Sequence, residues 1–419
     1  MNTDPATDPG ADAAPATDPG TSADAGRDGR RALAGHLADT GVLAAAWRPA
    51  FETVPRHLFL PPVYWEFTDA GTVERDRAQD PAAWMAGAYR DTPAVTQWDD
   101  GDDTAGMRDF TSSLSMPTMV ASMLRDLDVH DGHLVHEIGT GPGYNAALLA
   151  HRLGPDRVMS VEIDKTVADT ARANLTTAGL PGVRVVTGDG ADPTTGHEDG
   201  GGGRADRLIA TCSSLVTDLP TGWLDLTRPG GLLVAPVTTL FGGGAIARLR
   251  TADHGNSATG HFTGPCDFMR MRQQRYQAPP VDAYLPGEWP GNATASVTDL
   301  DPETIGSSWL AQLAIGTRLP DLYYRRALYQ NTVTWWFFDT AVTSWATVDS
   351  TPNADEYDVR QSGPRRLWDE IHTAFTTWQQ AGSPGWQRFG LTLTRTGERT
   401  MWLDQPDNQW SPPPAPPTT

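Results

Sequence analysis

One stretch constrains the fold of this chain more than any other: a hydrophobic run, a glycine-rich turn and an apolar helix-forming segment over residues 134–150. Glycines 139, 141 and 143 remove side chains where the backbone must approach a ligand closely or take a positive φ. A buried strand that leads through such a turn into a helix is the nucleotide-binding unit of a doubly wound sheet. The stretch therefore predicts an α/β, Rossmann-like fold with a ligand at the N-terminus of that helix.

The spacing of the glycines indicates what kind of ligand to expect. The turn reads Gly-x-Gly-x-Gly, whereas dinucleotide sites use Gly-x-Gly-x-x-Gly, and no Gly-Lys-Ser/Thr follows to hold a triphosphate. This spacing disfavours an NAD-dependent oxidoreductase and favours a smaller adenosine cofactor.

Two later hydrophobic runs end on acidic residues that suit such a cofactor. The run 157–164 ends on Glu162 and Asp164, and the run 183–190 carries Asp189 near its end. An acid about 20 residues beyond the glycines accepts hydrogen bonds from ribose hydroxyls, and Asp189 is placed to bind an adenine amino group. This order is the pattern of S-adenosylmethionine-dependent methyltransferases of class I, so S-adenosyl-L-methionine is the expected cofactor. The residues expected to bind it are Glu137, Gly139, Thr140, Gly141, Gly143, Tyr144, Glu162, Ile163, Asp189 and Gly190.

Four blocks resemble the motifs of protein-L-isoaspartate O-methyltransferases, in that family's order. They are residues 54–59 (Val-Pro-Arg-His-Leu-Phe), 113–117 (Ser-Leu-Ser-Met-Pro), 135–150 and 228–237. The resemblance implies that the Ser115 hydroxyl reaches the substrate carboxylate as the catalytic residue. From the sequence pattern, Ser115 also reads as the N-cap of a helix that begins near Pro117, and both roles can hold.

The chain departs from the family pattern where the substrate would lie. Thr118 stands where the family usually has an aromatic residue or His, and residues 211–214 (Thr-Cys-Ser-Ser) replace a small Ala-Ala-Pro turn. Arg56 and His57 could contact substrate or serve a structural role. The residues expected to contact substrate, besides Ser115, are Ser113, Pro117, Thr118, Arg56, His57, Ser213 and Ser214.

Composition limits the partners and the compartment. A net charge of −20 and a pI near 4.7 leave no basic block to neutralise phosphates, so no nucleic-acid partner is expected. No apolar run reaches the 18 or more residues of a membrane span. The two cysteines lie far apart without metal-ligand spacing, so we expect no metal site and a cytoplasmic protein.

Composition and pattern divide the chain into five segments. The expected segments are a disordered acidic tail (1–29), an N-terminal cap and loop (30–110), a cofactor-binding methyltransferase core (111–245), an additional α+β C-terminal domain (246–410) and a Pro-rich tail (411–419). Within the second segment, the polar stretch 66–110 is expected to be a long mobile loop over the site. In the fourth, residues 335–338 and 343–348 are strand-like, 362–378 is a capped helix and 390–404 a hairpin.

The C-terminal segment resembles the extra domain of actinobacterial homologues that mature ribosomally made peptides, the lanthipeptides and graspetides. That resemblance implies methylation of an aspartate carboxylate in a macrocyclic precursor peptide, after which the ester closes to aspartimide and can hydrolyse to isoaspartate. Maturation enzymes of the same pathway are then further expected partners. The alternative is a general protein-L-isoaspartate O-methyltransferase of protein repair. Either reaction starts from an ionised carboxylate, so rate comes from positioning and no general base is needed.

Overall fold

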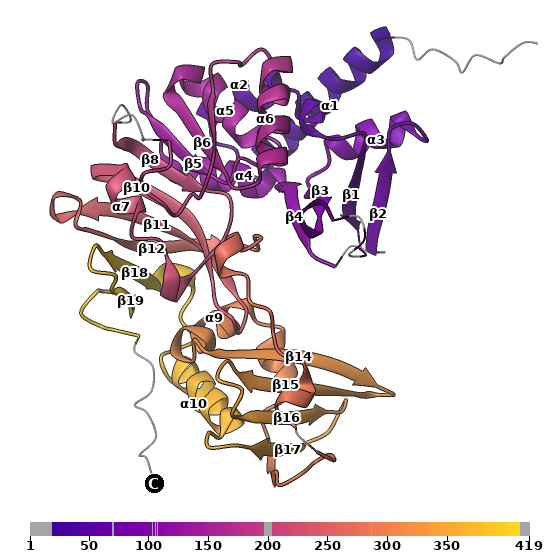
Figure 1. The fold of residues 1–419 in the computed structure, drawn as a ribbon, viewed down its shortest axis with the longest axis vertical. Coiled ribbons are helices and arrows are strands. Elements are labelled where there is room, and N and C mark those ends of the chain that lie inside the picture. The colour runs from indigo at the N-terminus through magenta and orange to yellow at the C-terminus, as the bar shows by residue number, and fades with distance from the viewer. Residues whose placement is uncertain are drawn as a thin grey trace, which may run out of the picture.

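The computed structural model describes residues 19–68, 71–102, 104, 106, 108–196, 203–285 and 287–410. Its strands form a four-stranded, a ten-stranded and a five-stranded sheet. In Figure 1 the four-stranded sheet lies to the right of the ten-stranded sheet, and the five-stranded sheet lies below it. No helix in this part of the chain is long and apolar enough to cross a membrane. The expected Pro-rich tail, 411–419, lies outside the described residues.

The central ten-stranded sheet carries the predicted doubly wound core. Its order is β19-β18-β12-β11-β10-β8-β5-β6-β7, and the five strands from β10 to β7 are parallel. These five are β5 (Val135–Ile138), β6 (Val158–Glu162), β7 (Arg184–Thr187), β8 (Ala205–Ala210) and β10 (Thr227–Thr238), and the two-residue β9 (Ser214–Leu215) also pairs with β10. Helices α5 (Tyr144–Leu153) and α6 (Lys165–Thr177) follow β5 and β6, as the strand–turn–helix pattern requires.

Strands β5, β6 and β8 are buried on both faces, which explains their continuous hydrophobic runs. Ile209 packs on one face in a cluster with α2 (Arg48–Thr53), α4 (Pro117–Leu127) and α5. Its neighbour Leu208 packs on the other face with α7 (Trp223–Leu226).

The chain before the core is more ordered than expected. Helix α1 spans Pro19–Asp39, so residues 19–29 are helical rather than part of a disordered tail, and residues 1–18 lie outside the described part. The expected mobile loop is instead the four-stranded antiparallel sheet β2-β1-β3-β4 with helix α3 (Pro81–Ala88). Its strands are β1 (Val63–Thr68), β2 (Gly71–Asp76), β3 (Ala94–Trp98) and β4 (Phe110–Leu114).

A buried ion pair explains why this polar segment folds. Glu66 on β1 is 1% exposed and accepts hydrogen bonds from Arg75 Nε at 2.8 Å and Arg90 Nη1 at 2.9 Å. The hydrogen bonds satisfy the carboxylate, and the Arg90 and Arg75 hydrogen bonds lower its pKa although burial alone would raise it. Ion pairs such as these join residues that are not neighbours in the sequence and produce no hydrophobic periodicity, so the sequence patterns did not predict this sheet.

The central sheet continues beyond the expected domain boundary at residue 245. Strand β11 (Gly244–Ala252) crosses that boundary, and β12 (Ser257–Pro265) pairs with β18 (Phe389–Thr394), which pairs with β19 (Arg399–Leu403). The expected 390–404 hairpin therefore forms, but it extends the core sheet rather than a separate domain. Pairing with β18 satisfies the backbone groups that β12 would otherwise leave open at a sheet edge.

Between β12 and β18 lies the five-stranded antiparallel sheet β13-β17-β16-β15-β14. Its strands are β13 (Thr294–Thr298), β14 (Leu322–Tyr329), β15 (Thr332–Asp339), β16 (Trp345–Ser350) and β17 (Tyr357–Ser362). Helices α8 (Pro302–Gly306), α9 (Trp309–Arg318) and α10 (Leu367–Gln380) accompany it. The two strand-like segments and the helix expected here match β15, β16 and α10.

Helix α9 joins the five-stranded sheet to the core. Leu313 packs in the hydrophobic cluster of the central sheet, and Ile315 in that of the five-stranded sheet. The contact is close, because a Cβ on Gly316 would collide with Thr239 at the end of β10.

Candidate active site

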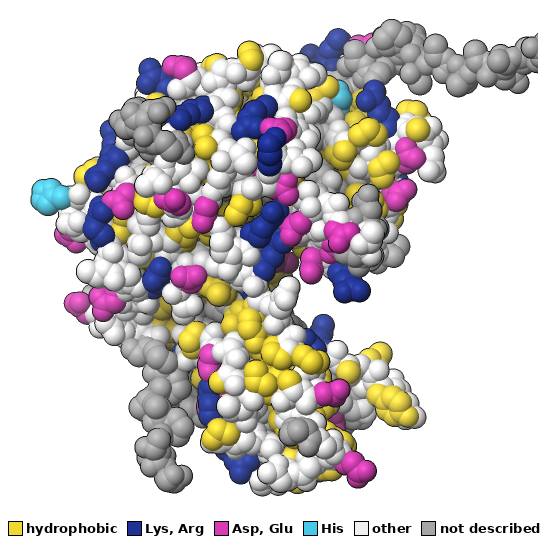
Figure 2. All heavy atoms as spheres, in the orientation of Figure 1, with side chains coloured by type: hydrophobic (Ala, Val, Ile, Leu, Met, Phe, Trp, Pro, Cys, Tyr) yellow, Lys and Arg dark blue, Asp and Glu magenta, His cyan; other side chains and the backbone are white. Residues whose placement is uncertain are grey.

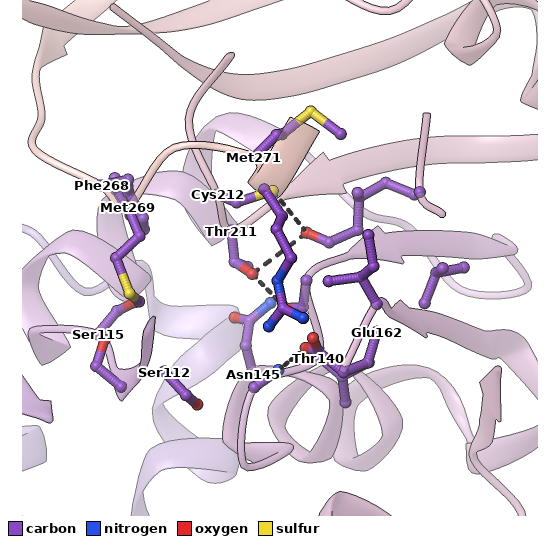
Figure 3. A pocket seen from close by; sticks show the side chains of 18 of the residues that line it. Ser112, Ser115, Thr140, Asn145, Glu162, Thr211, Cys212, Phe268, Met269 and Met271 are labelled. Carbon is purple, nitrogen blue, oxygen red and sulfur yellow. Dashed lines mark hydrogen bonds between the residues drawn. The ribbon is translucent and has the colours of Figure 1, made fainter. Parts of the chain in front are cut away.

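A pocket opens at the carboxyl edge of the parallel strands, where ligands bind in this fold class. It encloses about 1100 Å³, its mouth included, and Figure 3 shows it from close by. Its walls come from the ends of β5, β6 and β8, the loop after β7, residues 111–115 around β4 and a segment after β12, residues 268–275. The expected site residues that line it are Ser113, Ser115, Gly139, Thr140, Gly141, Tyr144, Glu162, Ile163, Asp189 and Gly190.

The glycine turn takes the backbone conformation that its sequence predicts. Gly139, Gly141 and Gly143 have φ of 92°, 53° and 100°, values that residues with a Cβ rarely adopt. Gly139 N donates to Val161 O at 2.8 Å, which ties the turn to the end of β6. Gly143 packs against α6 and does not itself line the pocket, so its expected cofactor contact is replaced by a conformational role.

Glu162 is held at the end of β6 by backbone donors on both sides. Gly141 N donates to its Oε2 at 2.9 Å and Asp164 N to its Oε1 at 3.1 Å. Burial raises the pKa of this carboxyl, and the two N–H groups oppose the shift. Each oxygen keeps a second lone pair, which suits a carboxylate that accepts bonds from two vicinal hydroxyls.

Glu137 lies behind the pocket wall instead of in it. It is fully buried, accepts a hydrogen bond from Asn145 Nδ2 at 2.7 Å and another from Ser160 Oγ, and burial raises its pKa to about 7. The expected direct contact of Glu137 with cofactor is thus not supported. Asn145, which does line the pocket, stands in front of it, and the sequence motifs did not point to this residue.

Ile163, Asp189 and Gly190 line another part of the pocket. Ile163 is 37% exposed although it is a large aliphatic residue, and Asp189 is half-buried with one carboxylate oxygen bonded to Ala191 N at 2.8 Å. Gly190 admits the close approach of Ile138, with which a Cβ would collide. An exposed aliphatic side chain beside an acid suits a flat base that carries an amino group.

At another part of the pocket, Ser115 directly follows β4 and forms part of the wall. It is not the N-cap of α4, as expected, because Met116 occupies that position and provides no side-chain cap. Asp91 caps the helix instead, accepting from Thr118 N at 2.8 Å and Thr118 Oγ1 at 2.6 Å. The Ser115 hydroxyl is thereby left for a ligand, whereas Thr118 and Pro117 do not line the pocket.

Arg56 and His57 belong to the scaffold, which is the structural alternative that the sequence left open for them, and neither lines the pocket. Arg56 is fully buried and donates to the carbonyl oxygens of Ala88 at 2.6 Å and Ser115 at 3.3 Å. His57 Nδ1 lies 2.6 Å from the Tyr89 hydroxyl, and burial lowers the pKa of His57 to about 4. Arg56 therefore positions Ser115 through its backbone and does not reach the pocket.

Ser213 and Ser214 also act one step away from the pocket. Ser213 Oγ donates to Phe268 O at 2.9 Å and Ser214 Oγ to Gln274 Oε1 at 3.1 Å. Their expected substrate contacts are therefore replaced by contacts to residues 268–275, which we call the roof segment. This segment (Phe-Met-Arg-Met-Arg-Gln-Gln-Arg) was missed, although three arginines in eight residues of so acidic a chain are a visible signal.

Ion pairs tie the roof segment across the pocket mouth. Arg272 Nη2 lies 2.8 Å from Asp100 Oδ1 and 3.1 Å from Asp164 Oδ2, and Arg275 Nη1 lies 2.7 Å from Asp100 Oδ2. Asp100 belongs to the short 3-10 turn Asp99–Gly101 beside the four-stranded sheet, and Asp164 caps α6 next to Glu162. The roof segment thus links the N-terminal sheet to the cofactor wall.

The arrangement fits an adenosyl amino-acid cofactor. The positions of Glu162 and Asp189 in the pocket wall are consistent with the ribose and adenine contacts expected from the sequence, and the glycine turn lies beside them. Among the described residues, no three His, Cys, Asp or Glu side chains gather as metal ligands would. Burial raises the pKa of the Cys212 thiol in the pocket to about 12, which keeps it protonated at neutral pH and unreactive.

Comparison with known proteins agrees with this arrangement. Residues 70–261 match the family model "Protein-L-isoaspartate(D-aspartate) O-methyltransferase (PCMT)". A protein-L-isoaspartate O-methyltransferase of Rhodopseudomonas palustris strain BisB5 is 39% identical over 182 residues, which are 43% of this chain and 73% of that one. A protein-L-isoaspartate O-methyltransferase 2 of strain HaA2 is 41% identical over 219 residues, 52% and 80% of the two chains.

A solved structure titled protein-L-isoaspartate O-methyltransferase aligns with 90% of this chain and 100% of its own. It is 19% identical in sequence, with a TM-score of 0.49.

Proposed function

This chain belongs to the protein-L-isoaspartate O-methyltransferase family, and from that premise we propose that it methylates the carboxylate of an isoaspartyl residue in a peptide or protein. It is an S-adenosylmethionine-dependent carboxyl O-methyltransferase, and its substrates are of the peptide class. The observation that carries the proposal is the pocket itself. A single cavity is lined both by Glu162 in the cofactor wall and by Ser115, whose hydroxyl has no hydrogen bond to any residue that the structure describes.

The pocket residues suit an in-line methyl transfer to a carboxylate. When bound, S-adenosylmethionine supplies an electrophilic methyl group on a sulfonium centre, so that an ionised carboxylate can attack without a general base. Glu162 and the glycine turn would then hold the cofactor, with Thr140, Tyr144 and Ile163 completing the wall. Ser115 would donate to the acceptor carboxylate and fix its direction of attack.

Water exclusion is the second requirement of this reaction. The roof segment covers the pocket with Phe268, Met269 and Met271, whose apolar side chains stand beside Ser115 and Cys212 (Figure 3). A less hydrated carboxylate is a better nucleophile toward a cation, and the charges of the carboxylate and the sulfonium partly neutralise each other in the transition state. The chain therefore contributes position and desolvation, not proton transfer.

The test is to incubate the protein and S-adenosylmethionine with a synthetic peptide that carries one L-isoaspartate. The intact mass of the peptide is then measured. A gain of one methyl group, absent in the same peptide with normal aspartate, supports the proposal. The Ser115→Ala variant should lose most of the turnover while it retains cofactor affinity. Equal turnover by Ser115→Ala and the unaltered protein would mean that Ser115 does not orient the acceptor carboxylate.

A second acceptor deserves a test because of one observation: the matched relatives account for only 43% and 52% of this chain. We propose as the second candidate that the acceptor is a normal aspartate in a macrocyclic, ribosomally made peptide. The region that includes the five-stranded sheet would then bind that peptide, and the ester would close to aspartimide. Thr211 and Cys212 in the pocket wall, where the family usually has small residues, also support an altered acceptor.

Intact mass separates the two candidates. A cyclised precursor peptide encoded near this gene, incubated with S-adenosylmethionine, should gain a methyl group and then show a net loss of water if aspartate is the acceptor. Turnover of the isoaspartyl peptide alone returns the protein to the isoaspartate class. In that case the five-stranded sheet needs another explanation, and maturation enzymes are no longer expected partners.

A further inference from the structure

The roof segment contains one arginine whose charge is not neutralised by the protein. Among the described residues, the Arg270 side chain has no ion pair and no hydrogen bond, and its Nε is buried without a partner. Arg272 and Arg275, two and five residues further on, both pair with Asp100. This contrast occurs in a chain with 52 acidic and 32 basic residues, where an acidic partner would be easy to supply.

The backbone holds Arg270 in place. Ser213 N donates to Met269 O at 2.8 Å, and Met271 N donates to Ser213 O at 2.8 Å, so a parallel bridge fixes the residues on each side of Arg270. Arg270 lines the pocket. The position of the Arg270 backbone is therefore set by Ser213, in the turn after β8, and does not depend on the side chain finding a partner.

Leaving this arginine unpaired costs stability. Burial lowers its pKa, because the charged form is less well solvated there, and an arginine stays protonated even so. Its neighbours Phe268, Met269 and Met271 offer no acceptor side chain of comparable strength. A partly buried cation without a protein partner suits a site where a ligand supplies the anion.

We propose that Arg270 binds the acceptor carboxylate of the substrate before methyl transfer. This inference rests on the proposed function and adds a recognition residue to it. Met269 and Phe268 stand next to Ser115 in Figure 3, which places the start of the roof segment at the acceptor end of the pocket. A guanidinium offers two parallel N–H donors to a planar carboxylate, and the apolar surroundings strengthen that pairing.

The assignment also explains how acid and ester are distinguished. The substrate carries a full negative charge at this group, and the methylated product carries none. Arg270 would hold the substrate by charge-assisted bonds and would lose them on methylation, which favours exchange of the ester for a new acid. The same arginine would reject peptides whose side chain ends in a neutral amide.

The test compares Arg270→Met with Arg318→Met in steady-state methylation of the peptide that the unaltered protein turns over. Arg318 is the matched control, since its Nε is also buried without a partner among the described residues but lies on α9, away from the pocket. We expect Arg270→Met to raise KM for the peptide roughly 10- to 100-fold, because hydrogen bonds to charged groups are worth that much. The value of kcat should stay the same or rise by less than about threefold, because the carboxylate charge that Arg270 binds is already partly lost in the transition state. Arg318→Met should change neither constant.

Binding to two peptides shows whether the effect is recognition of charge. In the presence of S-adenosylhomocysteine, calorimetry should show that the unaltered protein binds the carboxylate peptide at least tenfold more tightly than the same peptide with the acceptor carboxylate replaced by an amide. In Arg270→Met the ratio should fall to near one, while affinity for S-adenosylhomocysteine stays the same and the melting temperature stays the same or rises.

Three results for Arg270→Met would overturn the assignment of Arg270. They are an unchanged KM for the peptide, an equal loss of affinity for the carboxylate and the amide peptides, or a weakened affinity for S-adenosylhomocysteine instead. The last result would mean that Arg270 binds the carboxylate of the cofactor. Failure of the unaltered protein to methylate any aspartyl or isoaspartyl peptide is a different outcome, since it contradicts the proposed function before Arg270 is tested.

Discussion

At the scale of single residues, the site depends on carboxylates whose environments differ. Glu162 faces the pocket with two backbone donors, whereas Glu137 is sealed behind Asn145 and Ser160. The sequence motifs predict both as cofactor contacts. Because their burial and hydrogen-bond partners differ, we expect Glu162 to affect cofactor binding and Glu137 to affect the pH dependence of stability.

Glu162→Gln should weaken cofactor binding roughly 10- to 100-fold. The Gln amide has a single acceptor oxygen, so it cannot accept hydrogen bonds from both Gly141 N and Asp164 N as the two Glu162 oxygens do. The variant also loses charge-assisted hydrogen bonds worth about 1.5–3 kcal/mol. Calorimetric titration with S-adenosylhomocysteine measures the change. Asp156→Asn, at an exposed acid in the turn before β6, is the control and should bind normally. Normal affinity in Glu162→Gln would mean that the ribose is held elsewhere.

Glu137 should make stability depend on pH. Its pKa is about 7 in the folded protein, above the ordinary value of 4.5, so between these values the folded state holds a proton that the unfolded state has released. The free energy of unfolding should therefore fall as pH rises from 4.5 to about 7, by an amount on the order of 3 kcal/mol from this group.

Denaturant unfolding at several pH values checks this, with Glu137→Gln beside the unaltered protein. The variant should lose that part of the pH dependence and should be the more stable of the two above pH 7. Glu398→Gln, at an exposed position in the β18–β19 turn, should follow the unaltered protein at every pH. Parallel curves for Glu137→Gln and the unaltered protein would contradict the assignment.

At the scale of elements, the pocket is closed by a segment whose regular structure is one short 3-10 turn, Arg272–Gln274. The roof segment is held by Ser213, Ser214 and the Arg272 ion pairs, so it joins the β8 turn, the α6 cap and the Asp99–Gly101 turn. Cofactor binding beside Glu162 should be sensitive to these ties, because Asp164 receives Arg272 and donates its N–H to Glu162.

Arg272→Met should loosen the roof segment and weaken cofactor binding about 3- to 30-fold, since two partly exposed ion pairs are each worth up to about 1 kcal/mol. Hydrogen exchange should become faster in residues 99–101 and 268–275. Arg388→Met removes a comparable two-bond pair with Asp404 on the far hairpin and should leave both measurements unchanged. High salt should narrow the difference between Arg272→Met and the unaltered protein.

At the scale of the whole molecule, α9 holds the five-stranded sheet against the core. Residues on α9 belong to the hydrophobic clusters of both sheets, and Trp410 Nε1 near the end of the described chain donates to Ala314 O at 3.1 Å. Figure 2 shows the surface hollowed between the part that carries β1–β4 and the β14–β15 hairpin.

Gly316→Ala should lower the free energy of unfolding by about 1–3 kcal/mol, because the added methyl group collides with Thr239 and Phe241 in a packed interface. Gly35→Ala in α1, where nothing lies within 4 Å of the new methyl group, should instead raise it by about 0.5–1 kcal/mol through helix propensity. Chemical denaturation of both variants measures these changes. A stability of Gly316→Ala equal to that of the unaltered protein would mean that α9 and β10 are not tightly packed.

The sequence alone determined the cofactor half of this protein. Strand, glycine turn and helix at 134–150 depend on local chemistry, namely the φ that only glycine accepts easily and the period of buried side chains. The parallel strands at 158–162 and 184–187 follow from similar runs, and the acids at their ends are neighbours in the fold because carboxyl ends of parallel strands share an edge.

Only the tertiary structure decided what closes the pocket and what stays outside it. Arg56 and Thr118 were expected at the substrate, but partners far away in the sequence, Ala88 and Asp91, hold them in the scaffold. The roof segment comes to the site through hydrogen bonds between residues 55 or more positions apart, such as Ser213 to Phe268. Pairings over such distances leave no local period in the chain, which is why the acceptor half of the site required the folded molecule.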